Sequence, residues 1–311
     1  MRIHTDLDNL NFRNPAVTMG AFDGIHLGHQ KIINRVIEKS KELNGESVII
    51  TFYPHPKVFL NPQDPFKTIL THLDKIDRFY HHKIDHLVVL NFNEELSQMS
   101  GEDYVENILV KKIKMAHLVM GHDHCFGNNK LCSIDKINVL GEKYNFTTEQ
   151  VGAQTINNQV ISSSIIRDRL STGNIEEANK FLGYNYFVFG RVVHGNQIGK
   201  TIGFPTANIE IKKPHKKLPC NGVYIVKINW NGNIYNGICN LGIRPTIRKS
   251  KFTFEVHIFD FHRDIYQDYL TVSFIDRIRD EKRFNSLEAL KQQLSVDKKV
   301  ALEYFQSHPE I

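Results

Sequence analysis

Short apolar stretches alternate with helix-like segments along the first 150 residues of the chain. The apolar stretches are rich in Val and Ile and have the length of buried strands. The segments between them repeat apolar residues every three or four positions, as amphipathic helices do. This alternation predicts an open α/β sheet of parallel strands. The expected strands are Ala16–Phe22, Ser47–Phe52, His86–Leu90 and His117–Met120, and the expected helices are Gln30–Leu43, Leu73–His82, Tyr104–Lys112 and Ile134–Tyr144.

The pattern changes after Gly183, which ends a helical stretch that begins at Ser162. Strand-like segments now follow one another without helices, and Asn231–Asn233 has the composition of a hairpin turn. Consecutive short strands and one closing helix predict a small antiparallel β-barrel with a C-terminal helix. We therefore expect two domains, residues 1–183 and 184–311. The expected strands are Phe187–Val193, Gly222–Trp230, Ile234–Leu241, Phe252–Phe259 and Leu270–Asp276, and the helix is Leu287–Phe305.

The composition is that of a soluble globular protein and not of a membrane protein. Hydrophobic residues make up 41% of the chain, yet no apolar run reaches the length of a membrane span. The polar N-terminus has no stretch that resembles a signal peptide. Four cysteines make no disulfide framework in a chain of this size. These features predict a cytoplasmic protein.

The net charge of +5 raises the question of nucleic acid. The densest lysine groups, Lys111–Lys114 and Lys212–Lys217, are short, and other lysines are scattered. A solvated surface explains these groups better than a nucleic-acid tract, and a modest positive charge also suits polyphosphate ligands. We therefore expect small-molecule partners, no nucleic acid, and a monomer or weak homo-oligomer.

The segment VTMGAFDGIHLGHQKII carries the strongest chemical signal of the first half. A strand leads into a turn with Gly20, Gly24 and Gly28, which lets the backbone approach a ligand closely. The following helix offers free N–H groups and a positive dipole end to phosphate. His26 and His29 stand three positions apart, so both imidazoles can face one anion as partly cationic donors.

Less specific readings of this segment exist. A lone histidine is more often structural, and glycine-rich turns between strands and helices occur in many α/β proteins. A zinc site fits poorly, because helices that bind zinc usually space their histidines four apart and add a third ligand. The full combination, FDG followed by HxGH after the first strand, favours a nucleotide site.

The HxGH segment resembles the nucleotidyltransferase superfamily, which shares this signature with class I aminoacyl-tRNA synthetases. The string GAFDGIHLGHQKII is similar to the adenylyltransferase module of prokaryotic bifunctional riboflavin kinase/FAD synthetases. Three further segments fit that family, namely TFYPHPKVFL, MGHDHCFG and ISSSIIRDRL. The resemblance implies a Rossmann-like domain that binds ATP and FMN. It assigns catalytic roles to His26, His29 and Arg167, and ligand contacts to Gly20, Phe22, Asp23, Gly24, His55, Asp123 and Ser163.

The MGHDHCFG segment departs from the commoner motif, because His124 stands where an aromatic residue usually follows Asp123. The nearby group of His122, His124, Cys125 and Cys132 could suggest zinc. It contains no CxxC pair, and a gap of six residues is not a usual spacing of zinc ligands. We therefore expect no zinc there.

The segment GRVVHGNQIGKTIGFPTANI predicts a second phosphate site. Glycines around Lys200 can wrap phosphates with backbone N–H groups. Thr206 and Asn208 supply hard oxygen ligands suited to Mg²⁺. By composition alone, a flexible barrel loop explains this segment equally well, and the spacing is not that of a Walker loop.

GFPTANI resembles the signature of riboflavin kinase domains, and NLGIRPTI and FEVHIFDF fit the same family. The resemblance makes Glu255 the general base, although an alternating strand could carry it as an ordinary polar residue. Arg279, Glu281 and Phe284 lie where the family forms a flap over the flavin. The implied ligand contacts of the kinase are Gly199, Lys200, Gly203, Pro205, Thr206, Asn208, Arg279 and Glu281, with Thr206 and Asn208 on the metal.

Together the two resemblances imply an enzyme that phosphorylates riboflavin to FMN in the barrel and adenylylates FMN to FAD in the first domain, with ATP as co-substrate. A different adenylyltransferase with an appended barrel is one rival, but it leaves the PTAN segment and Glu255 without a purpose. A non-catalytic flavin- or RNA-binding protein is another rival. It predicts degraded catalytic positions or a dense basic stripe with aromatic residues, and neither is present.

Overall fold

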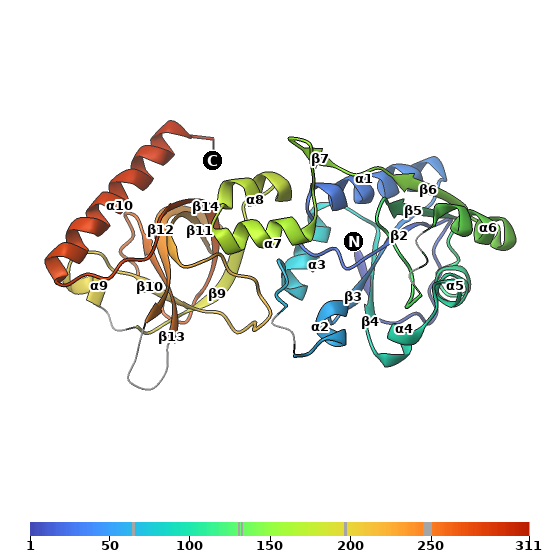
Figure 1. The fold of residues 1–311 in the computed structure, drawn as a ribbon, viewed down its shortest axis with the longest axis horizontal. Helices are drawn as coiled ribbons and strands as arrows, with labels where there is room; N and C mark the ends of the chain where they lie inside the picture. Colours follow the sequence, from blue (N-terminus) through green and yellow to red (C-terminus); the bar gives the residue numbers. More distant parts are fainter. Residues whose placement is uncertain (64–65, 130, 132, 196–197, 245–250, 311) are drawn as a thin grey trace. The chain divides into compact units, whose positions relative to one another are not determined.

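The structure is a computed structural model that describes residues 1–63, 66–129, 131, 133–195, 198–244 and 251–310 (Figure 1). Its contacts group the chain into two compact units, Met1–Ser163 and Ser164–Ile311. Helices α7 (Ser163–Thr172) and α8 (Ile175–Leu182) therefore pack mainly with the second unit. The change from helices to consecutive strands follows Gly183, and the expected division there stays a prediction.

The first unit contains the expected α/β sheet. All paired strands of this six-stranded sheet run parallel. Its central strands are buried along almost their whole length, which suits a parallel sheet covered by helices on both faces. In spatial order the strands are β1 (Arg2–His4), β4 (His86–Asn91), β3 (Ser47–Tyr53), β2 (Ala16–Met19), β5 (His117–Gly121) and β6 (Thr147–Val151).

Strand β2 lies at the point where the order of the strands reverses. The chain continues from β2 to β3 and β4 on one side, whereas β5 and β6 lie on the other. Ligands of open α/β sheets bind outside the carboxyl ends of the strands at such a switch point. The glycine-rich turn after β2 therefore occupies the position at which this architecture binds ligands.

The longer helices of the first unit lie close to their expected ranges, and several short elements were not expected. Strand β6 was missed because its sequence, TTEQV, is polar and only Val151 is buried, as befits an edge strand. The segment expected as one α-helix from Tyr104 is a π-helix. The helices are α1 (Leu27–Glu42), α2 (Pro56–Leu60), α3 (His72–His81), α4 (Glu94–Gln98), α5 (Gly101–Asp103), η1 (Tyr104–Val110) and α6 (Ile134–Tyr144), and a small hairpin joins β7 (Thr155–Ile156) to β8 (Gln159–Val160).

The second unit is the expected antiparallel barrel, closed by six strands (Figure 1). Aromatic rings of Tyr186, Tyr224, Phe254 and Phe274 pack together in its core. Strand β10 was missed because it has four residues, of which only Ile209 is buried. In spatial order the strands are β10 (Ala207–Glu210), β13 (Lys251–Ile258), β12 (Asn233–Arg244), β11 (Gly222–Trp230), β14 (Tyr269–Arg279) and β9 (Phe187–Val193).

The C-terminal helix α10 (Leu287–Ser307) packs on β12 and β14 of the barrel. Ser286 caps it by accepting a hydrogen bond from the backbone N–H of Ala289. Its buried Asp297 pairs with Arg279 of β14, which fastens the helix to the barrel. Within the described ranges, no helix has the length and apolar character needed to cross a membrane.

Candidate functional site

Two histidines stack at the start of α1, directly after the turn that follows β2. His26 is the N-cap residue, and its Nδ1 accepts a hydrogen bond from the backbone N–H of His29 at 3.3 Å. The two rings lie 3.7 Å apart between centroids, with 18° between their planes. The helix begins three residues earlier than expected, and both imidazoles lie at its positive end.

The structure corrects the expectation of a partly cationic imidazole for His29. Burial lowers the pKa of His29 well below its usual value, and neighbouring His26, His124 and Lys75 lower it further. His29 is therefore neutral at pH 7 without a bound anion. Its Nδ1 is buried and has no hydrogen-bond partner among the described residues, as expected of an atom that a ligand would satisfy.

His124, in the segment after β5, brings a third imidazole to this region. Burial lowers its pKa to about 4, so this ring is also neutral. A hydrogen bond links it to the backbone of Met19 at the end of β2, and its ring stacks against Phe126. The histidine thus packs through its ring face and adds hydrogen bonds that tie the end of β5 to β2.

The turn between β2 and α1 has an unusual backbone. Phe22, Gly24 and Ile25 all have positive φ angles, at 47°, 90° and 36°. Buried Asp23 holds this turn in place, because its Oδ1 accepts hydrogen bonds from the N–H groups of Ile69 and Leu70 at 2.8 and 3.2 Å. The carboxylate thus anchors the turn.

Ser163 and Gly28 also pack against this turn. The Ser163 hydroxyl donates to the carbonyl of Asp23 at 2.7 Å. A Cβ at Gly28 would come within 3.2 Å of the His26 ring. Gly28 therefore makes room for the imidazole. At Gly20, a Cβ would lie 3.4 Å from the Phe22 ring.

Three other predicted residues make local contacts of their own. His55 caps α2, with its Nδ1 accepting from the N–H of Lys57 at 3.1 Å. Asp123 is exposed after β5, 3.7 Å from the Nδ1 of His122. Arg167 lies on α7 in the second unit and donates to the hydroxyl of Ser164 at 3.3 Å, so its contact with triphosphate stays a prediction.

Sequence analysis missed Lys75, whose ammonium group is buried at the carboxyl ends of β2 and β3. Its Nζ donates to Thr51 Oγ1 at 2.9 Å and to the carbonyls of Ala21 and Phe52 at 3.1 and 3.3 Å. Only 6% of Lys75 is exposed. The helical spacing of α3 indicated an apolar face toward the sheet, but no sequence signal singled out this lysine.

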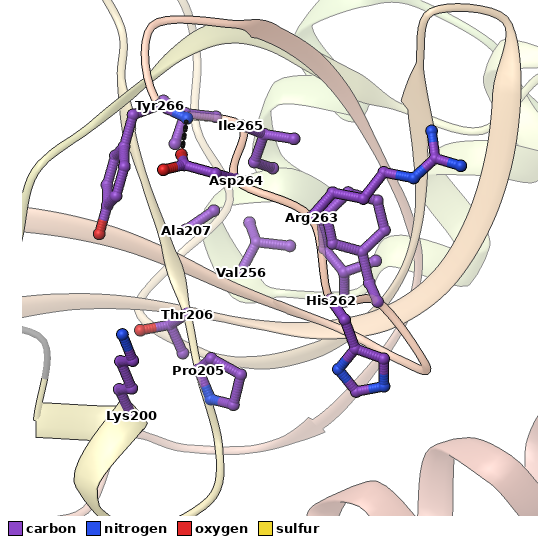
Figure 2. A pocket seen from close by; sticks show the side chains of 13 residues that line it. Lys200, Pro205, Thr206, Ala207, Val256, His262, Arg263, Asp264, Ile265 and Tyr266 are labelled. Atoms are coloured by element: carbon purple, nitrogen blue, oxygen red, sulfur yellow. Dashed lines mark hydrogen bonds between the residues drawn. The ribbon is translucent and has the colours of Figure 1, made fainter.

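The barrel contains a cavity of about 440 Å³ beside the PTAN segment (Figure 2). Lys200 and Thr206 lie on the same side of it, and Tyr266 lies near them. Asp264 accepts a hydrogen bond from the backbone N–H of Tyr266 at 3.0 Å. The lining also includes Pro205, Ala207, Val256, Phe261, His262, Arg263 and Ile265. Of the residues predicted for the kinase, Lys200, Pro205 and Thr206 therefore meet in one cavity.

Glycines of the predicted phosphate loop are needed for close packing. A Cβ at Gly195 would come within 2.1 Å of the amide nitrogen of Asn208. A Cβ at Gly199 would meet the carbonyl of Phe204 at 2.2 Å and Thr206 Oγ1 at 3.4 Å. Gly203 has a φ of 84°, which L-residues rarely adopt. The loop thus lies directly against the two predicted metal ligands.

Glu255 lies in the middle of three paired strands. On β13 it is opposite Asn208 of β10 on one side and Asn240 of β12 on the other. Directly paired residues share a face, with Cβ atoms about 4.5–5.5 Å apart. Glu255 and Asn208 therefore lie together, although neither is among the residues that line the cavity.

His257, also missed from the sequence, supports the neighbouring segment. It is buried, and its Nδ1 lies 2.8 Å from the carbonyl oxygen of Pro205. Because that oxygen can only accept, Nδ1 carries the proton. Residues 245–247 of the NLGIRPTI segment lie outside the described residues.

The predicted flap residues pack against the barrel and its closing helix. Arg279 forms a two-pronged ion pair with Asp297 at 2.7 and 2.9 Å, and its guanidinium lies over the Phe284 ring. Glu281 accepts from the N–H of Ile243 at 3.4 Å and fills the space beside Gly242. Arg279 thus anchors α10, and its contact with flavin stays a prediction.

The described residues contain no group of three His, Cys, Asp or Glu side chains able to hold a metal ion. Asn208 is paired with Glu255 and follows Thr206 by two residues, and these oxygen-bearing side chains are of the type that could hold Mg²⁺, so the metal stays a prediction. Cys125 is disulfide-bonded, which the cysteine count did not lead us to expect, whereas Cys220 and Cys239 are free.

Known sequence families match the two halves separately. Residues 9–165 match the family described as FAD synthetase, and residues 182–305 match the family described as riboflavin kinase. Over 297 residues the chain is 38% identical to a bifunctional riboflavin kinase/FMN adenylyltransferase of Buchnera aphidicola subsp. Schizaphis graminum, with 94% of both chains covered. It is 34% identical to the Haemophilus influenzae protein of the same name, over 99% of this chain and all of that one.

The chain belongs to the bifunctional riboflavin kinase/FMN adenylyltransferase family. In this family arrangement, the FAD synthetase domain is N-terminal and the riboflavin kinase domain is C-terminal. The stacked histidines lie in the former and the cavity beside the PTAN segment in the latter. A crystal structure described as a macrolide-efflux protein from Streptococcus pneumoniae shares the fold, with a TM-score of 0.87, 30% identity, and coverage of 96% of this chain and 98% of that one.

Proposed function

We propose that this chain converts riboflavin to FMN with its barrel and FMN to FAD with its first unit, consuming one ATP in each step. The observation that carries the proposal is that each matched domain has its own built site. One is the stacked His26–His29 pair at the start of α1. The other is the cavity with Lys200 and Thr206, close in sequence to Asn208 and the paired Glu255.

In the adenylyl transfer, an oxygen of the FMN phosphate attacks the α-phosphorus of ATP. The bond from that phosphorus to the bridging oxygen breaks, and pyrophosphate leaves. The N-terminal N–H groups of α1 and the imidazoles of His26 and His29 stabilise the charge that builds on the phosphate oxygens. Arg167 supplies a permanent positive charge to the triphosphate. An arriving anion raises the pKa of His29, because a nearby negative charge favours the imidazolium.

In the phosphorylation, the ribityl 5′-oxygen attacks the γ-phosphorus of ATP and ADP leaves. Glu255 accepts the proton of the attacking hydroxyl as general base. Thr206 and Asn208 would hold Mg²⁺, which neutralises charge on the nucleotide phosphates. Lys200 adds a positive charge on the cavity side of the site. His257 holds the carbonyl of Pro205, next to Thr206, and so orients that hydroxyl.

We further propose that the enzyme acts on small molecules in the cytoplasm, as a monomer or a weak homo-oligomer and without nucleic acid. The scattered placement of its lysines supports the last point, because nucleic-acid binding requires a concentrated basic surface. Both proposed reactions consume ATP, and the cytoplasm supplies ATP.

Isotope labelling separates the two reactions. Purified protein is incubated with riboflavin and either γ-³²P- or α-³²P-labelled ATP, and the flavins are resolved by chromatography. The γ-label is expected in FMN and then in FAD, because the phosphoryl group is retained. The α-label is expected in FAD alone. An α-label in FMN, or the absence of both labelled flavins, would contradict the proposal.

A further inference from the structure

Lys75 is a buried cation that the proposed mechanism does not use. It lies in the first turn of α3. Thr71 and Asp74 cap the start of this helix by a reciprocal capping box. Its ammonium group has three oxygen acceptors, two of them backbone carbonyls. Burying a cation is costly, so a position of this kind calls for an explanation.

The three acceptors belong to two segments that meet beside the stacked histidines. Ala21 is in the turn that leads into α1, whereas Thr51 and Phe52 end β3. Asp23 of the same turn also contacts this region. Its carboxylate accepts hydrogen bonds from the N–H groups of Ile69 and Leu70, which precede α3, and it attracts the Lys75 ammonium group. Lys75 thus joins α3, the turn and the end of β3 at one point.

We propose that Lys75 is a positioning residue for adenylyl transfer, whose ammonium group holds the carbonyl of Ala21 against the end of β3 and so fixes the turn that carries His26. This inference rests on the assignment of adenylyl transfer to the first unit. A polar anchor suits this place because the turn has positive φ angles at Phe22, Gly24 and Ile25 and needs a fixed partner. A misplacement of about 1 Å at a reacting centre costs about 10²-fold in rate.

The charge of Lys75 gives the inference a second, independent readout. Burial lowers its pKa from 10.5 to about 8, although Asp23 opposes this shift. FAD formation from FMN should therefore fall above about pH 8, as the ammonium group loses its proton. The other titratable groups near Lys75 are Asp23 from the turn and His29 from α1, with His26 and His124 beyond. Burial lowers the pKa values of His29 and His124, so neither of these rings gains charge in that range.

Deprotonation of Lys75 does not itself destabilise the fold in this range. Because the pKa of Lys75 is lower in the folded chain, the unfolded chain binds more protons between about pH 8 and 10.5. The contribution of Lys75 to stability therefore rises with pH over this range, while its positioning role is lost. The kinase reaction of the same chain reports any general effect of pH.

The test compares Lys75→Met with Lys83→Met, which removes an exposed lysine from the same unit. Lys75→Met should lower kcat/KM for FAD formation from FMN about 10²-fold. FMN formation from riboflavin should stay within twofold in both variants, and Lys83→Met should leave both reactions unchanged. Lys75→Arg, which keeps its proton, should restore part of the rate and abolish the loss above pH 8.

Normal FAD formation by Lys75→Met would overturn the inference. If that variant does not fold, the pH profile of the unmodified protein decides, and a constant ratio of FAD to FMN formation between pH 7 and 9.5 would contradict the proposal. An unmodified protein that forms FMN from riboflavin but no FAD from FMN would instead overturn the assignment of adenylyl transfer itself.

Discussion

The two sites of this chain use different physical means to handle the same nucleotide. The site of the first unit consists of histidine rings at the start of a helix, and burial keeps those of His29 and His124 neutral. The barrel site is an open cavity with Lys200, Arg263 and Asp264 in its lining and Glu255 on a strand nearby. The difference follows the chemistry, because adenylyl transfer to a phosphate oxygen needs no proton acceptor, whereas phosphorylation of a hydroxyl does.

The largest effect is expected from Glu255→Gln, which removes the proposed base while keeping the size of the side chain. FMN formation should fall about 10³-fold, within the range for loss of a general base. FAD formation from supplied FMN should not change. Glu210→Gln, on the exposed part of the neighbouring strand β10, is the matched control and should retain both rates. A Glu255→Gln variant with normal kinase activity would make this carboxylate a structural residue.

His29→Ala should have the next largest effect, and on the other reaction. Loss of one donor to the developing phosphate charge should lower FAD formation about 10²-fold. Initial rates with FMN as substrate measure this, and FMN formation should stay unchanged. His81→Ala serves as control, because that imidazole is exposed on α3. If both variants lose FAD formation equally, the effect is not specific to the stacked pair.

Much of this contrast can be predicted from the sequence. The parallel sheet, the barrel and the motifs that carry both sites follow from apolar periodicity, glycine placement and family resemblance. The protonation state of His29 in the first site does not follow from the sequence. The charge of His29 depends on burial and on His124, which lies almost a hundred residues away in the chain.

Lys75 and His257 escaped sequence analysis for a similar reason. Each fits an ordinary helix or strand pattern, and only tertiary structure reveals that their nitrogens meet buried carbonyl oxygens. Asp23 was expected to touch the ligand; its carboxylate binds backbone N–H groups, and its contact with the ligand stays a prediction. A motif identifies the residues of a site but not whether each contacts substrate or supports one that does.

Gly195→Ala, in the predicted phosphate loop of the barrel, should have a smaller effect on FMN formation. The added Cβ would displace the side chain of Asn208, so FMN formation should fall about tenfold while FAD formation stays normal. Steady-state kinetics at several Mg²⁺ concentrations should show a raised metal requirement. Gly152→Ala, where a Cβ would meet nothing within 4 Å, should be silent. An unchanged metal requirement in Gly195→Ala would separate Asn208 from Mg²⁺.

The smallest effect is expected from acid, which should lower the stability of the first unit more than that of the barrel. Burial lowers the pKa values of His117 and His124 to about 4, and both belong to the first unit. The unfolded chain binds more protons between about pH 4 and 6.5, so the first unit loses stability as pH falls through this range. Trp230 is the single tryptophan and lies in the barrel, so its fluorescence follows that unit alone.

Thermal scans at pH 7 and 5 should therefore show a drop of several degrees in the circular dichroism transition of the first unit. The tryptophan transition should move less. A larger shift of the tryptophan signal would show that protonation in the barrel dominates.

The central claim is that the two units perform successive reactions at separate sites. Mixing His29→Ala with Glu255→Gln tests it most directly, with riboflavin and MgATP as the only substrates. Alone, the first variant should stop at FMN and the second should leave riboflavin unchanged. Together they should form FAD, because FMN released by one chain is adenylylated by the other. A mixture that accumulates FMN without forming FAD, although Glu255→Gln remains folded, would contradict the account.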